Sequence, residues 1–250
     1  MKALVGSVVL VTGAARGIGH ASVKALRTAG ATVVPVDVDP GVDVLGDAVV
    51  ADLRDEAQLR AAVDAVLQRH GRWDVLVNNA GIGRHNPVAD VVTSDLDLMW
   101  AVNVRATVLL TREAFRVMST AGGGQVLNVV STAGLRGEPG ESAYCATKAA
   151  VRGFTEAAAE EGRLHGIRVH GLYPAGVDTG FWDDATHSGP GVDVGSDFLR
   201  AADVADAIVS VLRTPPHVHL PEVVLRAVRD ADTDRISAKL QRFRTSSRKA

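Results

Sequence analysis

Cysteine is almost absent from this sequence. Cys145 is the only cysteine among 250 residues, so no disulfide can form within the chain, and nothing in the composition indicates an oxidising compartment. A long apolar run is also lacking, because the run at the N-terminus stops at Thr12 and Gly13 and has no cleavage pattern. These absences favour the cytoplasm and give no reason to expect a membrane partner.

An excess of positive charge is missing as well. The formal net charge of −2 provides no broad positive field for nucleic acid or anionic lipid, so the sequence excludes both as partners. Only the tail from Lys239 to Ala250 is locally basic, and such tails are usually solvated ends. The eight histidines have no metal-ligand spacing such as HExxH, and no metal site is expected.

The composition is that of a folded protein, with 46% hydrophobic and 22% charged residues. Short β-branched runs alternate with longer segments in which apolar residues recur every three or four positions, which is typical of strands alternating with amphipathic helices. The expected strands are 7–11, 31–36, 49–50, 75–77, 125–130, 167–173 and 223–228, and the expected helices are 19–29, 56–69, 96–118, 143–165 and 202–213.

This alternation predicts an α/β fold, namely a single doubly wound Rossmann-type domain with a parallel sheet of about seven strands and helices on both faces. No repeat or linker divides residues 1–250. We expect a cofactor half over about residues 1–120 and a catalytic and substrate half over about residues 121–230. The glycine-rich segment 176–196 follows the sixth strand, where it is well placed to cover a substrate.

A glycine-rich turn joins the first strand to the first helix. Its sequence is TGAARGIG at residues 12–19, with glycines at Gly13, Gly17 and Gly19. Glycines permit the tight turn and a close backbone approach, and the helix N-terminus offers free N–H groups to a pyrophosphate. The position of this turn between a strand and a helix predicts dinucleotide binding, with Arg16 and Ile18 in the same loop.

An acidic residue ends the second strand. Asp37 lies 18 residues beyond Gly19, where a carboxylate can accept hydrogen bonds from the adenosine ribose and repel a 2′-phosphate. Asp37 therefore favours NAD(H) as the cofactor. Arg16 could contact a phosphate, which leaves NADP(H) open, and Asp39 is a rival for the ribose.

Tyr144 and Lys148 are four residues apart in a helical segment, so both side chains project from one face. A free tyrosine has a pKa near 10 and is a poor base at neutral pH. A neighbouring ammonium and a positively charged nicotinamide ring would favour the phenolate and lower this pKa. Ser131, 13 residues before Tyr144, can hydrogen-bond the same substrate oxygen, although alone it would be read as a turn or helix-cap serine.

These motifs occur together in one order, with Asn78-Asn79-Ala80-Gly81 after the fourth strand and Asn103 in the next helix. The glycine turn, NNAG, Asn103, Ser131 and YxxxK together resemble the short-chain dehydrogenase/reductase family, over residues 12 to about 180. The resemblance implies an NAD(P)-dependent oxidoreductase acting on a carbonyl or secondary alcohol. It also implies a homodimer or homotetramer.

The resemblance further implies roles for individual residues. Tyr144 would transfer the proton, Ser131 would steady the substrate oxygen, Lys148 would hold the nicotinamide ribose, and Asn103 would hold a water of the proton relay. The family also implies further contacts with the cofactor. These are Asp52 and Leu53 at the adenine, Asn79, Ala80 and Gly81 at the adenosine, and Val177 and Thr179 at the nicotinamide carboxamide. Asn78 is expected to be structural. By itself, Asp52 could instead cap the helix that begins near Asp55.

Two segments depart from the family pattern. Where the family has Asn-Pro-Gly, this chain has Tyr173-Pro174-Ala175-Gly176, so the local turn is not fixed by the pattern. Where many members have Val-Asp-Gly-Gly, residues 219–225 read HLPEVVL, which puts an inherited tetramer contact in doubt. Substrate-pocket candidates come from loops after the fourth, fifth and sixth strands: His85, Leu135, Arg136, Glu138, Trp182 and His187, beside Ser131 and Tyr144.

Two other functions are consistent with parts of the sequence. A nucleotide-sugar epimerase or dehydratase shares YxxxK but usually adds a substrate domain of roughly 100 residues, for which 250 residues leave too little room. A non-catalytic NAD(H)-binding regulator would need the glycine turn but neither Ser131 nor Tyr144. The substrate itself is not specified by the sequence.

Overall fold

The computed structural model describes residues 4–181 and 198–228 of the chain. Trp182, His187 and the basic tail 239–250, all singled out from the sequence, lie outside the described residues.

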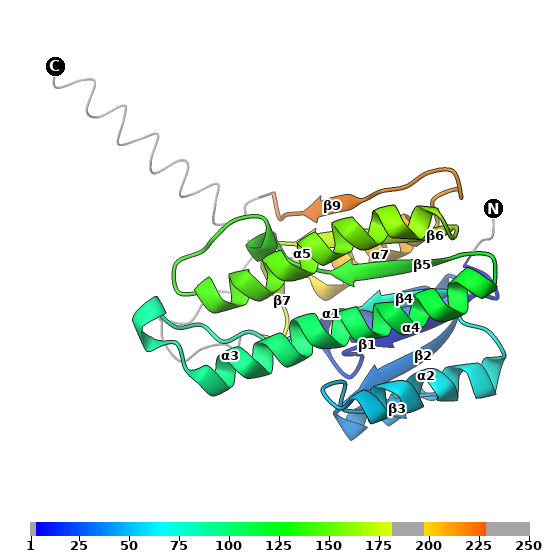
Figure 1. Cartoon of the computed structure of the whole chain (residues 1–250), viewed down its shortest axis with the longest axis horizontal. Helices are drawn as coiled ribbons and strands as arrows, with labels where there is room; N and C mark the ends of the chain where they lie inside the picture. The colour runs from blue at the N-terminus through cyan, green and yellow to red at the C-terminus, as the bar shows by residue number, and fades with distance from the viewer. Residues whose placement is uncertain (1–3, 182–197, 229–250) are drawn as a thin grey trace, which may run out of the picture.

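A seven-stranded parallel sheet forms the centre of the molecule, in the order β3-β2-β1-β4-β5-β6-β9 (Figure 1). The strands are β1 (Val8–Thr12), β2 (Thr32–Asp37), β3 (Val49–Val50), β4 (Val75–Asn78), β5 (Gly124–Val129), β6 (Ile167–Pro174) and β9 (Glu222–Leu225). The predicted fold class is therefore confirmed. The last strand ends three residues earlier than expected, since its pairing with β6 stops at Leu225 opposite Pro174.

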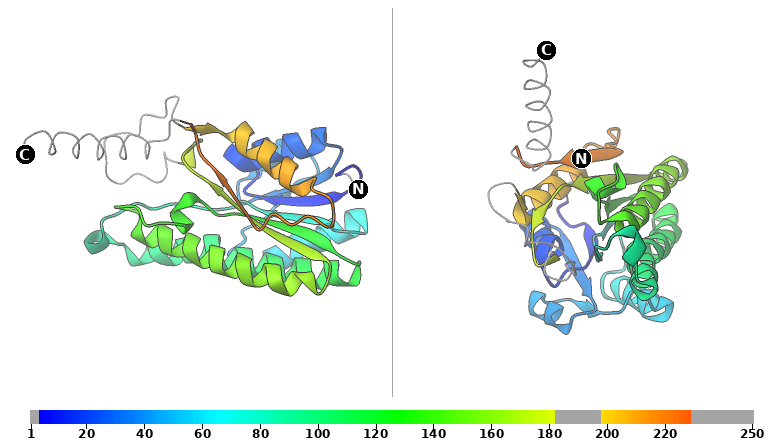
Figure 2. Two further views of the ribbon diagram at one scale, coloured as in Figure 1. Left: turned by 90° about the horizontal axis from the view of Figure 1, so that it is seen from above. Right: turned by 90° about the vertical axis from the view of Figure 1, so that its left-hand side faces the viewer.

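Helices cover both faces of this sheet (Figure 2). They are α1 (Gly17–Thr28) and α7 (Ala201–Leu212) on one face, and α2 (Glu56–His70), α4 (Ala106–Thr120) and α5 (Ser142–Arg163) on the other. Alternate residues of β1 show why both faces are apolar: Val9 packs with the α1 and α7 side, whereas Leu10 packs with the α2, α4 and α5 side. The sheet is thus buried on both sides.

The predicted helix 96–118 is divided into three parts. α3 (Thr93–Met99) leads into a π-helical turn, η3 (Trp100–Arg105), which continues into α4. A π-turn accommodates one extra residue, and such turns often occur at functional sites. Here it contains Asn103, whose side chain is buried against the loop after β4. Periodicity alone does not show this insertion because apolar spacing is kept on either side of it.

Short elements complete the carboxyl end of the sheet. They are η1 (Pro40–Leu45), η2 (Val88–Asp90), η4 (Thr132–Gly134) and a separate two-stranded pair, β7 (Val177–Asp178) with β8 (Leu199–Arg200). The chain runs from β1 outward to β2 and β3, then returns to β4 on the other side of β1. Loops after β1 and β4 diverge at this switch point, which is where open α/β sheets bind ligands.

Candidate active site

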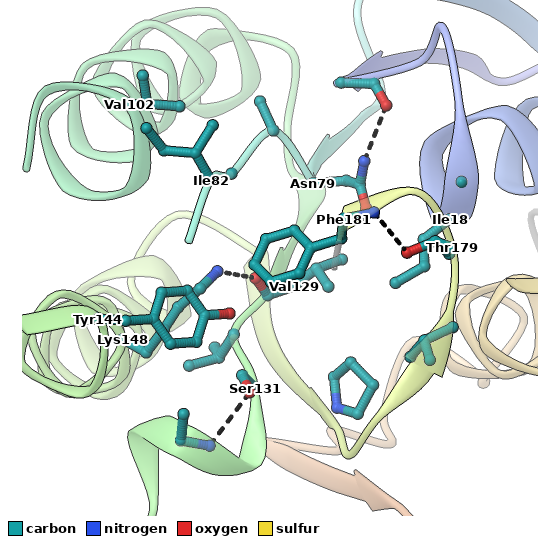
Figure 3. Close-up of a pocket in the computed structure, with 18 of the residues that line it drawn as sticks. Ile18, Asn79, Ile82, Val102, Val129, Ser131, Tyr144, Lys148, Thr179 and Phe181 are labelled. Atoms are coloured by element: carbon teal, nitrogen blue, oxygen red, sulfur yellow. Dashed lines mark hydrogen bonds between the residues drawn. The ribbon is translucent and has the colours of Figure 1, made fainter. Parts of the chain in front are cut away.

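A cleft of about 520 Å³ lies at the carboxyl ends of the strands. Its lining includes all but six of the residues singled out from the sequence for the catalytic, cofactor and pocket roles. Those that line it are Gly13, Arg16, Gly17, Ile18, Asp37, Asp52, Leu53, Asn79, Ala80, Gly81, Ser131, Arg136, Glu138, Tyr144, Lys148, Val177 and Thr179. Gly19, His85, Asn103 and Leu135 lie outside the lining, and Trp182 and His187 lie outside the described residues. Figure 3 shows Tyr144, Lys148 and Ser131 at one side of this cleft and Ile18 and Thr179 at the other.

The glycine turn is packed against the end of β4 with no space for side chains. Gly13 has a φ of +64°, and a Cβ there would lie 2.8 Å from the Ala80 Cα. A Cβ on Gly19 would lie 2.0 Å from the Gly13 carbonyl oxygen. Gly19 therefore serves the loop through packing rather than by lining the cleft. The first turn of α1 follows at once, so its N–H groups face the cleft side of this loop.

Thr12 and Asn79 fasten the glycine turn to the loop after β4. The Thr12 Oγ1 accepts hydrogen bonds from the backbone N–H groups of Asn79 (3.0 Å) and Ala80 (2.9 Å). In return the Asn79 side-chain amide donates to the carbonyls of Thr12 (2.9 Å) and Gly13 (3.1 Å). The Asn79 amide is thus used to brace the loop. Thr12 was not singled out from the sequence.

Asn78 is buried beneath the cleft and links the sheet to the helices. Its Nδ2 donates to the Asn128 Oδ1 at 2.8 Å and to the Thr111 Oγ1 at 3.1 Å, and the Asn128 Nδ2 donates to the Thr155 Oγ1 at 2.8 Å. This row of polar groups ties β4 and β5 to α4 and α5. The structural role given to Asn78 agrees with these contacts.

The geometry distinguishes Asp37 from Asp39. Asp37 lines the cleft, and its Oδ2 accepts from the Ala15 backbone N–H at 2.8 Å. Asp39 instead caps η1 by accepting from the Gly41 N–H at 2.8 Å, and it is absent from the described lining of the cleft. Only Asp37 is therefore in position to meet a ligand while holding the glycine turn.

Asp52 and Leu53 line the same end of the cleft. Asp52 is ion-paired with Arg54, whose guanidinium hydrogen bond holds the pKa of the carboxyl below its usual value. It does not cap α2. That position belongs to Asp55, which accepts from the Ala57 N–H at 2.8 Å, so the capping interpretation of Asp52 is wrong.

Tyr144 and Lys148 lie on one face of α5, as the spacing predicts, and both are buried. Lys148 Nζ donates to the Val129 carbonyl at 3.2 Å and lies 5.7 Å from the centre of the Tyr144 ring. Burial lowers the pKa of Lys148 from 10.5 to about 8. Burial also raises the pKa of Tyr144, and the opposing effect of a Ser131 hydrogen bond is smaller. In the chain alone the Tyr144 phenolate is thus disfavoured. The lowering of the Tyr144 pKa that the sequence led us to expect would therefore need positive charge from a bound ligand.

Ser131 occupies the cap position that its residue type alone suggested, and its role at the substrate oxygen stays a prediction. Its Oγ accepts from the Ala133 N–H at 3.1 Å and so caps η4. Ser131 is also close enough to Tyr144 to oppose, in part, the rise in the pKa of that residue. The cap fixes the serine side chain where β5 ends. Ser131 and Tyr144 therefore present two hydroxyl groups to the same part of the cleft.

Asn103 joins the loop after β4 to α5. Its Nδ2 donates to the Ile82 carbonyl at 2.9 Å and to the Thr147 Oγ1 at 3.0 Å, while its Oδ1 accepts from the Ile82 N–H at 2.9 Å. Both amide protons are used within the protein, and its main-chain carbonyl accepts from the Thr107 hydroxyl at 2.8 Å. The side chain thus clamps the loop after β4 to Thr147, the neighbour of Lys148 in α5. The water role expected for Asn103 stays a prediction.

The end of the cleft around Tyr144 has an apolar wall and a charged rim. Residues that line it and were not predicted are Ile82, Val102, Glu141, Phe181 and Phe198, together with the predicted candidates Arg136 and Glu138. Phe181 and His85 are ring neighbours of Tyr144, with ring centres at 5.8 and 6.0 Å. Phe181 lies within the segment 176–196 expected to cover the substrate and Phe198 lies just after it, and this was the one signal that could have identified them.

Leu135 and Tyr173 differ from expectation. Leu135 packs against Val130, Val151 and Tyr173, so it turns away from the cleft that it was predicted to line. Tyr173, which replaces the family asparagine, is fully buried, and its hydroxyl donates to the Glu222 Oε1 at 3.0 Å. It has room because Gly171 lacks a side chain: a Cβ there would lie 2.7 Å from the tyrosine oxygen. The turn that follows Tyr173 still reaches the cleft through residues 174–177.

Residues 4–181 and 198–228 hold neither a cluster of metal-ligating side chains nor a helix that could cross a membrane. No three histidine, cysteine, aspartate or glutamate side chains in this part of the chain cluster closely enough to hold a metal ion. In the same residues no helix has the length and apolarity needed to span a membrane.

Comparisons with known proteins agree with this geometry. A family model described as short chain dehydrogenase matches residues 7–188. The sorbitol dehydrogenase of Cereibacter sphaeroides is 35% identical over 187 residues, which cover 71% of this chain and 73% of that protein. Among solved structures, the 3-ketoacyl-(acyl-carrier-protein) reductase of Brucella melitensis, complexed with NADH, is 32% identical with a TM-score of 0.83, covering 90% of this chain and 99% of its own. An alcohol dehydrogenase of Thermococcus sibiricus, complexed with 5-hydroxy-NADP, shares the fold. It is 24% identical with a TM-score of 0.82, and the match covers 90% of this chain and 97% of its own.

Proposed function

Since this chain belongs to the short-chain dehydrogenase family, we propose that it is an oxidoreductase that uses a nicotinamide dinucleotide to interconvert a carbonyl group and a secondary alcohol. One observation carries the proposal. Ser131, Tyr144 and Lys148 meet at one end of a cleft whose other end is formed by the glycine turn and Asp37. A protein that only bound the cofactor would need neither Ser131 nor Tyr144.

The cleft fits such a cofactor. The glycine turn offers backbone without side chains, and the N-terminus of α1 offers unsatisfied N–H groups for a pyrophosphate. Asp37, Asp52 and Leu53 line the end for the adenosine, whereas Val177 and Thr179 line the path toward Tyr144. When bound, the nicotinamide ring supplies the site that gives or takes the hydride. We place Gly13, Arg16, Gly17, Ile18, Asn79, Ala80 and Gly81 along the same path.

We propose NAD(H) as the preferred cofactor. The Asp37 carboxylate lies in the cleft lining and would repel the 2′-phosphate of NADP(H), while its oxygens can accept from ribose hydroxyls. The Brucella relative is bound to NADH, which supports this choice. Arg16 also lines the cleft and keeps NADP(H) as an alternative for the test below.

In the reduction direction, Tyr144 would donate its proton to the substrate oxygen as the carbonyl carbon accepts the hydride. The Ser131 hydroxyl would hydrogen-bond the same oxygen and stabilise the charge that develops on it. Lys148 would hold the nicotinamide ribose and, as a cation near the Tyr144 ring, stabilise the phenolate that remains once the proton has been donated. Oxidation reverses these steps, with Tyr144 accepting the proton.

Asn103 would act as a positioning residue in this proposal. Its clamp between Ile82 and Thr147 holds the loop after β4 against α5, one residue from Lys148. Phe181 and Ile82 border the space around Tyr144 and would limit the access of water. Both amide protons of Asn103 are used in this clamp, so a water of the proton relay would be held by other polar groups beside it.

The test combines cofactor binding with turnover. Purified protein is titrated with NADH and NADPH, and the absorbance of the reduced nicotinamide is then followed with a panel of ketones and secondary alcohols. Tyr144→Phe should keep NADH affinity but lose turnover by about two orders of magnitude, because the proton donor is gone. Tyr173→Phe is the matched control: Tyr173 is the only other tyrosine, and its hydroxyl faces Glu222.

Several outcomes would change the assignment. Normal turnover in Tyr144→Phe would refute the role of Tyr144, and tighter binding of NADPH than NADH would refute the preference assigned to Asp37. Tight NADH binding without turnover across the panel would favour the non-catalytic regulator instead. The cytoplasmic location and the homodimer or homotetramer expected from the sequence stay predictions.

A further inference from the structure

Two aromatic rings lie beside the ring of Tyr144 and come from segments far apart in the sequence. Phe181 follows β7, and its ring centre lies 5.8 Å from that of Tyr144, with the two planes tilted by 54°. His85, in the loop after β4, has its ring centre 6.0 Å from that of Tyr144. Both distances are in the range at which aromatic rings contact each other. The tyrosine that would serve the substrate oxygen is therefore flanked by rings from two different loops.

Gly83 makes room for the ring of Phe181. A Cβ on Gly83 would lie 2.7 Å from the Phe181 Cζ, which is closer than two carbon atoms can approach without a shift. The same Cβ would lie 3.2 Å from the His85 Nε2. Gly83 has no positive φ, so its backbone conformation does not by itself call for glycine. The missing side chain at residue 83 therefore serves the packing of the Phe181 ring.

Phe181 also borders the space that a substrate would enter. It lines the cleft together with Ile82, Ala133 and Tyr144, and these four residues belong to one apolar cluster. Figure 3 shows the Phe181 ring pointing toward Tyr144. The Phe181 backbone N–H donates to the Thr179 Oγ1 at 3.3 Å, which fixes the start of the side chain. The ring thus packs on Gly83 and contributes its surface to the cleft beside Tyr144.

A ring in this position has a definite effect on ligand shape. Its surface is apolar, so it suits an apolar group on the carbonyl carbon. A group that is branched directly beside the carbonyl carries its bulk at a fixed short distance from the reacting carbon. Extra methyl groups there would press against the ring, and a close-packed ring gives way only at a cost. An unbranched group can bend away from the ring instead.

Resting on the oxidoreductase function proposed above, we infer that Phe181 is a specificity-determining residue, and that the site takes apolar ketones and alcohols that are unbranched beside the reacting carbon. Phe181 acts on the substituent of that carbon, whereas Ser131 and Tyr144 act on its oxygen. Gly83 is a positioning residue, because it acts on the substrate only through the Phe181 ring.

Two isomeric methyl ketones test the inference: hexan-2-one, and 3,3-dimethylbutan-2-one, which is branched beside the carbonyl. Dissociation constants are measured by the change in fluorescence of protein-bound NADH, and kcat/KM is measured by NADH oxidation. The wild type should favour hexan-2-one by at least about tenfold in affinity. Variants are compared by how they change the ratio between the two ketones, so the intrinsic reactivity of each ketone cancels.

Phe181→Ala removes the ring that the branched ketone would meet. It should raise both the affinity and the kcat/KM for the branched ketone, relative to hexan-2-one, by about tenfold. Phe181→Leu keeps an apolar side chain of intermediate size and should give a smaller change in the same direction. The leucine variant also keeps the test open if the alanine variant does not fold.

Gly83→Ala tests the positioning role. The added methyl group should push the Phe181 ring toward the cleft and lower the relative affinity for the branched ketone by about threefold. In a Phe181→Ala background the same substitution should leave the ratio unchanged, because the ring is gone. A glycine with a merely structural role would have the same effect with and without the ring.

Two control variants make the same chemical changes away from the cleft. Phe154→Ala removes a partly buried ring of α5 that lies outside the cleft lining, roughly 15 Å along the helix from Tyr144. Gly153→Ala adds a methyl group where no atom lies within 4 Å. Both controls should leave the ratio between the two ketones at the wild-type value.

Three results would overturn the inference: equal affinity of the wild type for the two ketones, an unchanged ratio in both Phe181 variants, or an effect of Gly83→Ala that persists without the ring. The proposed function is judged separately. It fails if NADH does not bind, or if bound NADH is not oxidised by any ketone of the wider panel, whereas the ratio of dissociation constants reports on Phe181 even without turnover.

Discussion

Replacing Lys148 by methionine should stabilise the cofactor-free protein at neutral pH while removing its activity. Lys148 is 5% exposed, and its Nζ makes a single hydrogen bond among the described residues, to the Val129 carbonyl. Such a buried ammonium is held in place at a cost in stability. Methionine has a similar length and carries no charge.

The size of the effect follows from the pKa of Lys148, which burial lowers from 10.5 to about 8. At about 1.36 kcal/mol per unit, the charged form destabilises the fold by roughly 3 kcal/mol at pH 7. The lost hydrogen bond to Val129 offsets about 1 kcal/mol of the gain. Lys148→Met should therefore be about 2 kcal/mol more stable than the wild type at pH 7.

The sign of the pH dependence is fixed. The unfolded chain binds the lysine proton more tightly than the folded one, so the stability of the wild type rises with pH between about 8 and 10.5. At pH 9.5 only about 1.4 kcal/mol of the penalty should remain, and the advantage of Lys148→Met should nearly vanish. Lys24, an exposed lysine of α1, gives the matched control Lys24→Met, for which no such trend is expected.

Chemical denaturation of the cofactor-free protein at pH 7.0 and 9.5 measures this difference, and NADH oxidation checks the loss of turnover. A variant that is less stable than the wild type at pH 7.0 would refute the reasoning. So would a difference in unfolding free energy that stays the same at the two pH values.

Two further predictions concern other buried positions. His170 is fully buried and its pKa is lowered to about 4, mainly by burial, so the wild type should lose about 3 kcal/mol of stability between pH 6.5 and 4 as the unfolded chain takes up the proton. Acid denaturation of His170→Asn should lack this loss, and that of the exposed-site variant His165→Asn should keep it; identical curves for all three proteins would count against the assignment. Gly19→Ala would place a Cβ 2.0 Å from the Gly13 carbonyl, so NADH titration and thermal melting should show weakened binding and a loss on the order of 2 kcal/mol. Gly153→Ala on α5 has open space around the new methyl group and should stabilise; equal behaviour of the two variants would disprove the packing role of Gly19.

The sequence predicted the sheet, its layers and the place of the cleft because each depends on local signals. The glycine turn could be placed from its position between a β-branched run and an amphipathic helix, and both were found where expected. Tyr144 and Lys148 share a face because a helix repeats every 3.6 residues. Side chains whose roles depend on contacts across the chain were less predictable, as with the choice between Asp37 and Asp39.

By itself, the sequence determined a parallel α/β sheet with a glycine turn after its first strand and a tyrosine–lysine pair on one helix, since strand and helix periods and short motifs are local properties. Only the tertiary structure decided that Asn103 clamps two elements, that Leu135 leaves the cleft, and that Glu141 enters it. It also decided the direction of the pKa changes at Tyr144 and Lys148, because desolvation depends on how many atoms from distant segments surround a charge.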